Sequence, residues 1–460
     1  MIKLVPNTGS EPCAPIWFVG PGDWRERATA LGPVAAAFAE ASGFAAAPGS
    51  VLLAPGSDGR IAAVLFGDDA AAGRRDPFHA GRLASALPSG CYSLPDDVAP
   101  SAVLALLLGS YAFTRYRAAA SSADIRIVAP ERLDGAGLER IAAAVAMGRD
   151  LINTPANDLG PAELEQAART LAGKHRAGLE VTVGDDLLAQ NFPMVHAVGR
   201  ASSRAPRLID LTWGETFNPK VTLVGKGVCF DTGGLNIKPD ASMLLMKKDM
   251  GGAATALAAA WMIMEAKLPV RLRVIVPAVE NAISGSAFRP GDVLPSRKGP
   301  TVEIGNTDAE GRLILADALA LADEDEPELL LDFATLTGAA RVALGPDLPP
   351  FYTDDEALAA QVAAAAEAVN DPVWRLPLWK PYRTMLDSKV ADINHIGGSF
   401  AGSVTAALFL RSFVEKTKAY AHFDIYGWTP SGKPGRPEGG EPQAARLVFE
   451  LVQKRYGSRT

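Results

Sequence analysis

The sequence predicts an α/β protein of two domains, each a mostly parallel (mixed) sheet flanked by helices. From about residue 153 onward, short apolar runs rich in β-branched residues alternate with longer runs of helical periodicity, which is typical of a sheet covered by helices. The length of 460 residues also favours more than one domain. A third observation distinguishes the two predicted domains: residues 1 to about 135 are rich in Ala, Gly and Pro, and they carry no cluster of ionisable side chains.

The first part of the chain contains few clear elements. The alternation over Arg60–Phe66 predicts a strand, and the apolar run Ala102–Leu108 predicts a buried helix or strand. Apolar residues at helical spacing predict a helix that ends near Ile152, because Asn153-Thr154-Pro155 is a helix terminator. We therefore expect an N-terminal domain over 1–135, a connecting helix over 136–152 and a second domain over 153–460.

The second domain shows a regular order of elements. Strands are predicted at Val221–Val224, Leu272–Val279, Thr301–Ile304 and Leu329–Phe333, and helices at Ala253–Ala266 and Leu313–Ala322. In such sheets ligands bind beyond the carboxyl ends of the strands. We expect a functional site there.

Composition excludes several classes of protein. The net charge is −7, which argues against nucleic acid as the main partner. The N-terminus lacks the long apolar region of a signal peptide, and no run of about 18 apolar residues exists to span a membrane, so we expect a cytoplasmic protein. The three cysteines (Cys13, Cys91 and Cys229) are far apart and form no CxxC, which predicts neither a disulfide framework nor a thiolate zinc site.

Three segments of the second domain concentrate ionisable residues at predicted strand ends or helix starts. The first contains Lys226 and Asp231, the second contains Lys238 and Asp249, and the third is the run Asn306–Leu313 with Asp308, Glu310 and Arg312. None of them contains the phosphate-binding pattern GxxxxGK[ST] or a histidine, so a phosphate loop and an HExxH zinc site are both excluded there.

The third segment suggests what the cluster holds. Read as extended, it places Asp308, Glu310 and Arg312 on one face, and two carboxylates that close together need a cation between them. The alternative is that one of residues 306–308 caps a helix beginning near Arg312. Lys226 with Asp231 could likewise be a plain ion pair, and Asp249 a helix cap. Taken together, four carboxylates and three cations favour a carboxylate-bridged site for two divalent metals, in which a deprotonated lysine could also be a ligand.

The sequence is similar to a known family in the order and spacing of five motifs. GKGVCFDTGG, IKP, KKDMGGAA, NTDAEGRLILADAL and TLTGAA resemble the leucyl aminopeptidase (cytosol aminopeptidase, peptidase M17) family from about Arg149 to the C-terminus. The resemblance implies a catalytic second domain and an enzyme that releases N-terminal amino acids, leucine-type and broad, from peptides. It also implies a hydroxide that bridges two divalent metal ions per subunit (Mn²⁺ or Zn²⁺), and a homohexamer.

The resemblance also implies a role for each motif residue. Asp231 and Glu310 correspond to bridging carboxylates, Lys226, Asp249 and Asp308 to further metal ligands, Lys238 to an electrophilic lysine and Arg312 to the holder of a bicarbonate ion. The wall of the side-chain pocket would comprise Met246, Thr335 and Gly338, with a segment near Ala401–Thr405.

Two departures from the family pattern are visible. Thr232 replaces a frequent Ser, and Arg341 follows TLTGAA where an apolar residue or Cys is frequent, which leaves the preferred side chain open. Three other functions are weighed against the peptidase: an inactive homologue kept as a scaffold, a nucleic-acid-binding protein, and an enzyme that cuts a dipeptide or another amide. The filled motif positions and the acidic charge weigh against the first two.

Overall fold

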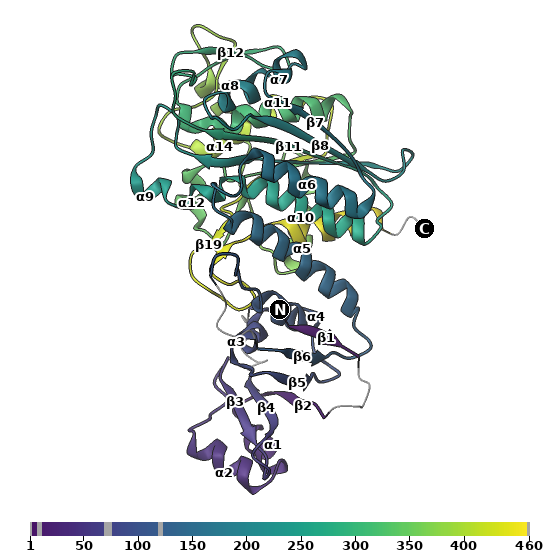
Figure 1. Ribbon diagram of the computed structural model, residues 1–460. Helices are drawn as coiled ribbons and strands as arrows, with labels where there is room; N and C mark the ends of the chain where they lie inside the picture. Colours follow the sequence, from purple (N-terminus) through teal and green to yellow (C-terminus); the bar gives the residue numbers. More distant parts are fainter. Residues whose placement is uncertain (1, 7–11, 69–75, 118–122, 458–460) are drawn as a thin grey trace. The chain divides into compact units, whose positions relative to one another are not determined.

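The computed structural model describes residues 2–6, 12–68, 76–117 and 123–457 (Figure 1). The chain divides into two compact units, one comprising 1–146 with 431–438 and the other 147–430 with 439–460. The division falls within helix α5 (Gly135–Asn153), which is the helix predicted to end near Ile152. Both units are mixed α/β, as predicted. None of the described helices is long and apolar enough to cross a membrane.

The N-terminal unit is built on a six-stranded sheet in the order β1-β6-β5-β2-β4-β3, in which only β3 runs antiparallel to its neighbour. The predicted strand near Arg60 is β4. The run Ala102–Leu108 is helical, because Pro100 opens α4 at its first turn. The elements are β1 (Lys3–Val5), β2 (Ala14–Val19), α1 (Trp24–Ala30), α2 (Pro33–Ala41), β3 (Val51–Pro55), β4 (Ile61–Gly67), η1 (His79–Arg82), α3 (Leu83–Ala86), β5 (Gly90–Ser93), α4 (Pro100–Gly109) and β6 (Ile125–Val128).

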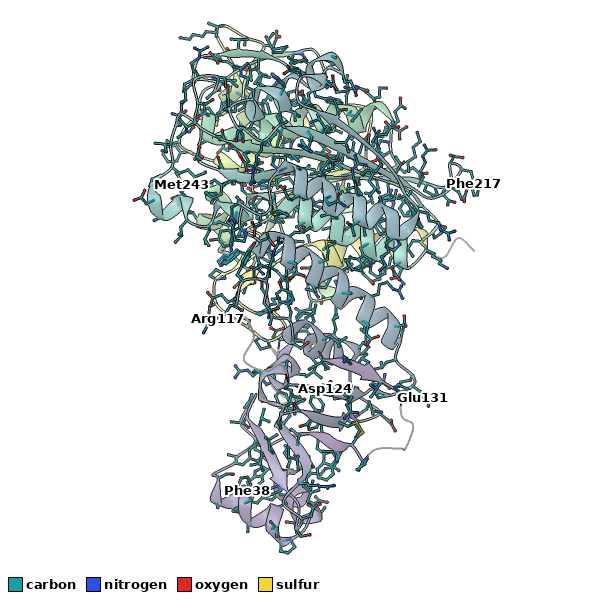
Figure 2. All side chains as sticks on the ribbon, in the orientation of Figure 1. Phe38, Arg117, Asp124, Glu131, Phe217 and Met243 are labelled. Atoms are coloured by element: carbon teal, nitrogen blue, oxygen red, sulfur yellow. A yellow bond between two sulfur atoms is a disulfide. The ribbon has the colours of Figure 1, made fainter. Side chains whose placement is uncertain are left out.

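A disulfide joins Cys13 to Cys91 in this unit, and it appears as a yellow bond in Figure 2. The prediction of no disulfide framework is therefore wrong for this pair. The two cysteines are 78 residues apart in sequence, but β2 and β5 pair in parallel through Ala14 and Tyr92, which brings the two Cα atoms to 4.6 Å. Sequence spacing did not reveal this strand pairing. Cys229 is a buried free thiol.

The second unit contains a larger mixed sheet in the order β16-β15-β18-β14-β9-β11-β8-β7, with β10 pairing alongside β11. Strands β18, β14, β9 and β11 are mutually parallel, and β10 is parallel to β11. The strands are β7 (Gly178–Val183), β8 (Arg207–Trp213), β9 (Lys220–Gly225), β10 (Gly227–Asp231), β11 (Arg271–Asn281), β14 (Leu329–Ala334), β15 (Pro350–Tyr352), β16 (Trp374–Arg375) and β18 (Tyr420–Asp424). Smaller sheets contain β12 (Val293–Pro295), β13 (Thr301–Glu303) and β17 (Ile393–Asn394), and β19 (Trp428–Thr429) with β20 (Gly439–Gly440).

Helices cover both faces of this sheet, with α6 and α10 on one side and α8 and α11 on the other (Figure 1). They are α6 (Pro161–His175), α7 (Asp186–Ala189), α8 (Pro193–Gly199), α9 (Asp240–Met243), α10 (Gly251–Glu265), α11 (Glu310–Glu324), α12 (Gly338–Leu344), α13 (Glu356–Ala368), α14 (Gly402–Arg411) and α15 (Ala445–Tyr456). Short 3₁₀ turns are η2 (Met246–Met250), η3 (Thr307–Ala309) and η4 (Lys380–Leu386).

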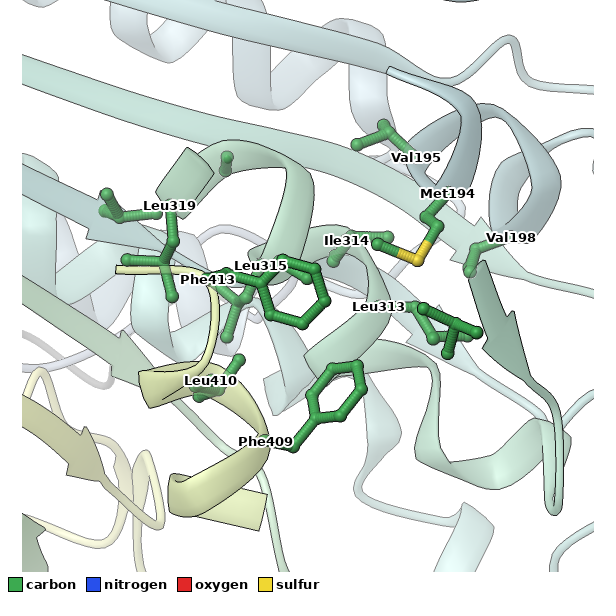
Figure 3. Packing of buried hydrophobic residues seen from close by; sticks show 14 of the residues in the cluster. Met194, Val195, Val198, Leu313, Ile314, Leu315, Leu319, Phe409, Leu410 and Phe413 are labelled. Atoms are coloured by element: carbon green, nitrogen blue, oxygen red, sulfur yellow. The ribbon is translucent and has the colours of Figure 1, made fainter. Parts of the chain in front are cut away.

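Helix α11 is held by a large apolar core. Leu313, Ile314 and Leu315 are fully buried and belong to the same core cluster as Val195 of α8 and Phe409 of α14 (Figure 3). A fully buried leucine side chain contributes about 2 kcal/mol by transfer from water alone. This packing fixes the first turn of α11, which carries Glu310 and Arg312.

Candidate metal centre

The predicted site residues meet at the carboxyl ends of the parallel strands. Lys226 directly follows β9, Asp231 is the last residue of β10, and Thr335 directly follows β14. The backbone N–H of Lys226 donates to the carbonyl of Phe333 on β14 at 2.9 Å, which ties the ends of two adjacent strands together. Gly252 permits this arrangement, since a side chain there would collide with the same carbonyl.

The third ionisable segment is not extended, so that prediction is wrong. Residues 307–309 form the 3₁₀ turn η3, and α11 begins at Glu310. The side chain of Asn306 accepts a hydrogen bond from the backbone N–H of Asp308 at 2.8 Å, so the capping alternative describes the local structure. The carboxylates still converge, because Asp231 reaches them from β10: ligand atoms of Asp231, Asp308 and Glu310 all lie within 4.8 Å of one another.

Lys226 lies between two of the acids. Its Nζ is 2.7 Å from Asp249 Oδ2 and 3.0 Å from Glu310 Oε1, and it donates to the carbonyl of Thr335. Burial alone would lower the pKa of Lys226, but the surrounding carboxylates outweigh it and raise that pKa above its ordinary value. Lys226 is therefore an ammonium here, and it could become a ligand only where a cation displaces its proton.

Lys238 occupies a similar position between the other two acids. Its Nζ is 2.8 Å from Asp231 Oδ2 and contacts Asp308 Oδ1. Burial works to lower the pKa of Lys238, yet Asp231 and Glu310 raise it above the ordinary value, so the side chain stays cationic. The structure thus brings both lysines and all four predicted carboxylates together.

The carboxylates fit divalent cations. Burial raises the pKa of Asp231, of Asp249 and of Asp308, because charged forms lose water. Asp249 Oδ2, Asp308 Oδ1 and Glu310 Oε1 are buried, and no described residue donates a well-aligned hydrogen bond to them, although an ammonium lies at ion-pair distance. Hard oxygen atoms with unused lone pairs are the ligands that divalent cations such as Mn²⁺ accept.

Two residues position these acids: Asn281, which the sequence did not reveal, and Thr335, which it predicted only as part of the pocket wall. The amide of Asn281, at the end of β11, lies 2.8 Å from Asp231 Oδ1, 3.0 Å from the carbonyl of Thr307 and 3.4 Å from Glu310 Oε2. The hydroxyl of Thr335 lies 2.7 Å from Asp249 Oδ1. Asn281 is far in sequence from every motif residue, so only the fold could place it here.

Arg312 lies near the cluster but faces a different partner. Its Nη1 donates to the carbonyl of His395 at 2.9 Å, and its buried Nε has no hydrogen-bond partner among the described residues. Burial lowers the pKa of Arg312 to about 10, so it is still a cation at neutral pH. The His395 ring lies 2.9 Å from the carbonyl of Asn306 and 3.2 Å from the N–H of Gly305, which connects it to the segment that carries Asp308.

A cavity of about 350 Å³ opens beside the cluster. Its wall includes all three predicted pocket residues, Met246, Thr335 and Gly338, but not the segment Ala401–Thr405, which forms the start of α14. Residues that line it and that were not predicted as site residues are Ala241, Ser242, Leu245, Lys248, Leu336, Thr337, Ile425 and Tyr426. Arg341, noted as a departure from the family pattern, lines it as well.

Comparison with known proteins identifies relatives along almost the whole chain. A model of the cytosol aminopeptidase family, catalytic domain, matches residues 146–449, and a model of the M17 aminopeptidase N-terminal domain matches residues 20–130. A probable cytosol aminopeptidase of Roseiflexus castenholzii is 40% identical over 389 residues, covering 81% of this chain and 80% of that protein.

Solved structures agree with this. The crystal structure of cytosol aminopeptidase from Coxiella burnetii superposes with a TM-score of 0.93 at 43% identity, covering 99% of both chains. The bottromycin maturation enzyme BotP in complex with Mn superposes with a TM-score of 0.86 at 33% identity, covering 96% of this chain and 99% of that one.

Proposed function

The chain belongs to the cytosol aminopeptidase family and is thus a metal-dependent hydrolase, and we propose that it removes N-terminal amino acids from peptides with leucine-type, broad preference. One observation carries the proposal: Asp231, Asp308 and Glu310 present carboxylate oxygens within 4.8 Å of one another. The buried Lys226 and the half-buried Lys238 lie among them, and the cavity beside them is large enough for an amino-acid side chain.

We assign five metal ligands from this arrangement. Asp231 and Glu310 would bridge two divalent ions, Lys226 and Asp249 would complete one ion, and Asp308 would complete the other. When bound, the two ions supply a bridging hydroxide near neutral pH and a Lewis acid for the scissile carbonyl. Mn²⁺ or Zn²⁺ suits the donor set, and the Mn complex of the relative BotP supports the first.

Lys238 would stabilise the negative charge that develops on the substrate carbonyl oxygen. It stays protonated beside Asp231, so it can donate hydrogen bonds to an oxyanion. Such a contact strengthens as charge develops, which is the condition for lowering the barrier rather than only binding substrate.

Arg312 would hold a bicarbonate ion that serves as the proton acceptor. The unpartnered Nε supports this, since a guanidinium can donate in parallel to two oxygens of a planar anion. The four acids of the cluster are all assigned as ligands, so none is left to act as a base. A catalytically inactive scaffold is disfavoured because each assigned position is filled.

The experiment tests metal dependence and the need for a free amine together. Chelation should abolish hydrolysis of an unblocked peptide, Mn²⁺ or Zn²⁺ should restore it, and metal analysis should find two ions per subunit. A peptide with an acetylated N-terminus should stay intact, because the free α-amine would bind a metal. Rapid cleavage of the acetylated peptide would exclude an aminopeptidase.

The assembly and the location are proposals too. We propose a homohexamer in the cytoplasm. Sedimentation of the full chain would test the first, and a sedimentation coefficient typical of a monomer or a dimer would contradict it. Cell fractionation would test the second.

A further inference from the structure

The cavity beside the metal centre has two cationic side chains in its wall besides Lys226 and Lys238. Arg341 of α12 and Lys248 of η2 both line it, and both lie against the ring of Tyr426: the guanidinium carbon is 5.7 Å and the Lys248 Nζ 4.6 Å from its centroid. A pocket that takes only leucine-like side chains would not need either charge.

Arg341 is firmly held and yet partly unsatisfied. Its Nη2 donates to Oδ1 and to the backbone carbonyl of Asp424, both at 2.6 Å. Asp424 is fully buried and also accepts hydrogen bonds from two backbone N–H groups and from the hydroxyls of Thr337 and Ser403. The carboxylate therefore fixes the guanidinium in place, while the buried Nη1 has no hydrogen-bond partner among the described residues.

Lys248 supplies a second positive charge nearby. Lys248 is 6% exposed, and no described carboxylate lies within ion-pair distance of its Nζ. Asp231, Asp249 and Asp308 line the same cavity, and two divalent ions bound there would offset the negative charge of the carboxylate cluster. Asp424 is the carboxylate that holds Arg341, and its oxygens are already engaged. Asp249, the acid that acts most strongly on Lys248, is assigned to a metal ion.

We propose that this wall selects peptides whose N-terminal residue is acidic, with the carboxylate of a Glu or Asp side chain accepting from Arg341 Nη1 and Lys248 Nζ. The inference rests on the proposed aminopeptidase function, and within its broad preference it places acidic N-terminal residues ahead of leucine-type ones. Leu245, Met246 and Ile425 line the rest of the cavity, which explains how uncharged side chains would also enter. A site built to hydrogen-bond a substrate group discriminates strongly against analogues that lack it.

The experiment compares dipeptides that differ in one charge. Glu-Ala, Gln-Ala and Leu-Ala are hydrolysed by the full-length, Mn²⁺-loaded enzyme, and kcat/KM is determined for each. Gln is the matched neutral analogue of Glu, so the Glu:Gln ratio measures the charge preference alone. We expect a ratio of at least tenfold in favour of Glu, because charge-assisted hydrogen bonds are about twice as strong as neutral ones.

Variants locate the preference in the wall. Arg341→Met should lower the Glu:Gln ratio at least tenfold while the Leu:Gln ratio changes less than threefold, and Arg341→Lys should retain part of the preference. Lys247→Met is the control, since its Nζ bonds the carbonyl of Asn153 and Lys247 does not line the cavity. Calorimetry with the free products glutamate and glutamine should show the same order of affinities.

The dipeptide kinetics distinguish failure of the acidic preference from failure of the aminopeptidase function. A wild-type Glu:Gln ratio of one or below, with normal hydrolysis of Leu-Ala, would overturn the acidic preference and leave the aminopeptidase function standing. An equal loss of the ratio in Arg341→Met and Lys247→Met would also overturn it, because the effect would then follow net charge. No hydrolysis of any dipeptide by fully metal-loaded enzyme would overturn the proposed function itself.

Discussion

Asn281 offers a sharp test of how the carboxylates are held, because one buried amide serves two of them. Its side chain carries two hydrogens and lies within reach of Asp231, Glu310 and the carbonyl of Thr307. Asn281→Ala removes both donors at once. Asn281→Asp places a fifth carboxylate against the others.

The magnitude follows from the bonds that are lost. The contact with Asp231 at 2.8 Å is a hydrogen bond to a charged group, worth about 1.5–3 kcal/mol, and the contact with the Thr307 carbonyl at 3.0 Å adds about 1 kcal/mol. Asn281→Ala should therefore lower the free energy of unfolding, measured with chelator present, by about 3 kcal/mol. Asn281→Asp should lower it further, since like charges repel in a buried site.

Metal affinity should change as well. Loss of an outer-shell partner typically costs about 10- to 100-fold in affinity, so Mn²⁺ titration by calorimetry should show weaker binding in Asn281→Ala. Asn157→Ala, an exposed change, is the control. If Asn281→Ala unfolds at the wild-type denaturant concentration and binds Mn²⁺ with wild-type affinity, the amide does not hold the acids.

Three further predictions concern other parts of the molecule. Lys238→Met should reduce kcat about 100- to 1,000-fold with both metals still bound, whereas Asp231→Asn should lose metal too; metal analysis beside kinetics separates the two roles. Burial lowers the pKa of His395 to about 4, so the folded protein keeps it neutral while the unfolded chain takes up a proton below about pH 6.5. Stability should thus fall by up to about 3 kcal/mol as pH drops from 6.5 to 4, and His395→Gln, compared by urea denaturation, should lack this component of the loss. Deleting residues 1–135 should alter assembly or solubility more than the metal content of the second unit, and a soluble, correctly assembled product that binds no metal would contradict this.

The sequence predicted the parts of the site that depend on local patterns. Buried apolar runs located β9, β14, α10 and α11, and the resemblance to the family selected ionisable residues that the structure brings into one cluster. Prediction from the sequence failed where residues that are neighbours in space are distant in the chain. Asn281 and His395 belong to no motif. The pairing of β2 with β5, which allows the Cys13–Cys91 disulfide, cannot be deduced from residue spacing.

The error over residues 306–312 has a different origin. Alternation of charged residues is compatible with an extended segment, but Asn306 can bond the backbone N–H two residues on, and that local bond starts a helix. Convergence of the acids then required a second element, β10, to supply Asp231. Gly311 contributes as well, since a Cβ there would lie 2.5 Å from Cε of Lys226.

The assignment of residues 431–438 to the N-terminal unit bears on how the chain folds during synthesis. A side chain on Gly435 would lie 2.8 Å from the ring of Phe78, so this late segment packs closely against the early part of its unit. A ribosome makes the chain from its N-terminus. The N-terminal unit therefore lacks residues 431–438 until more than nine-tenths of the protein has been translated. Until then, the surface around Phe78 that residues 431–438 cover is open to solvent or chaperones. The N-terminal unit can complete its packing only when synthesis of the second unit is nearly finished.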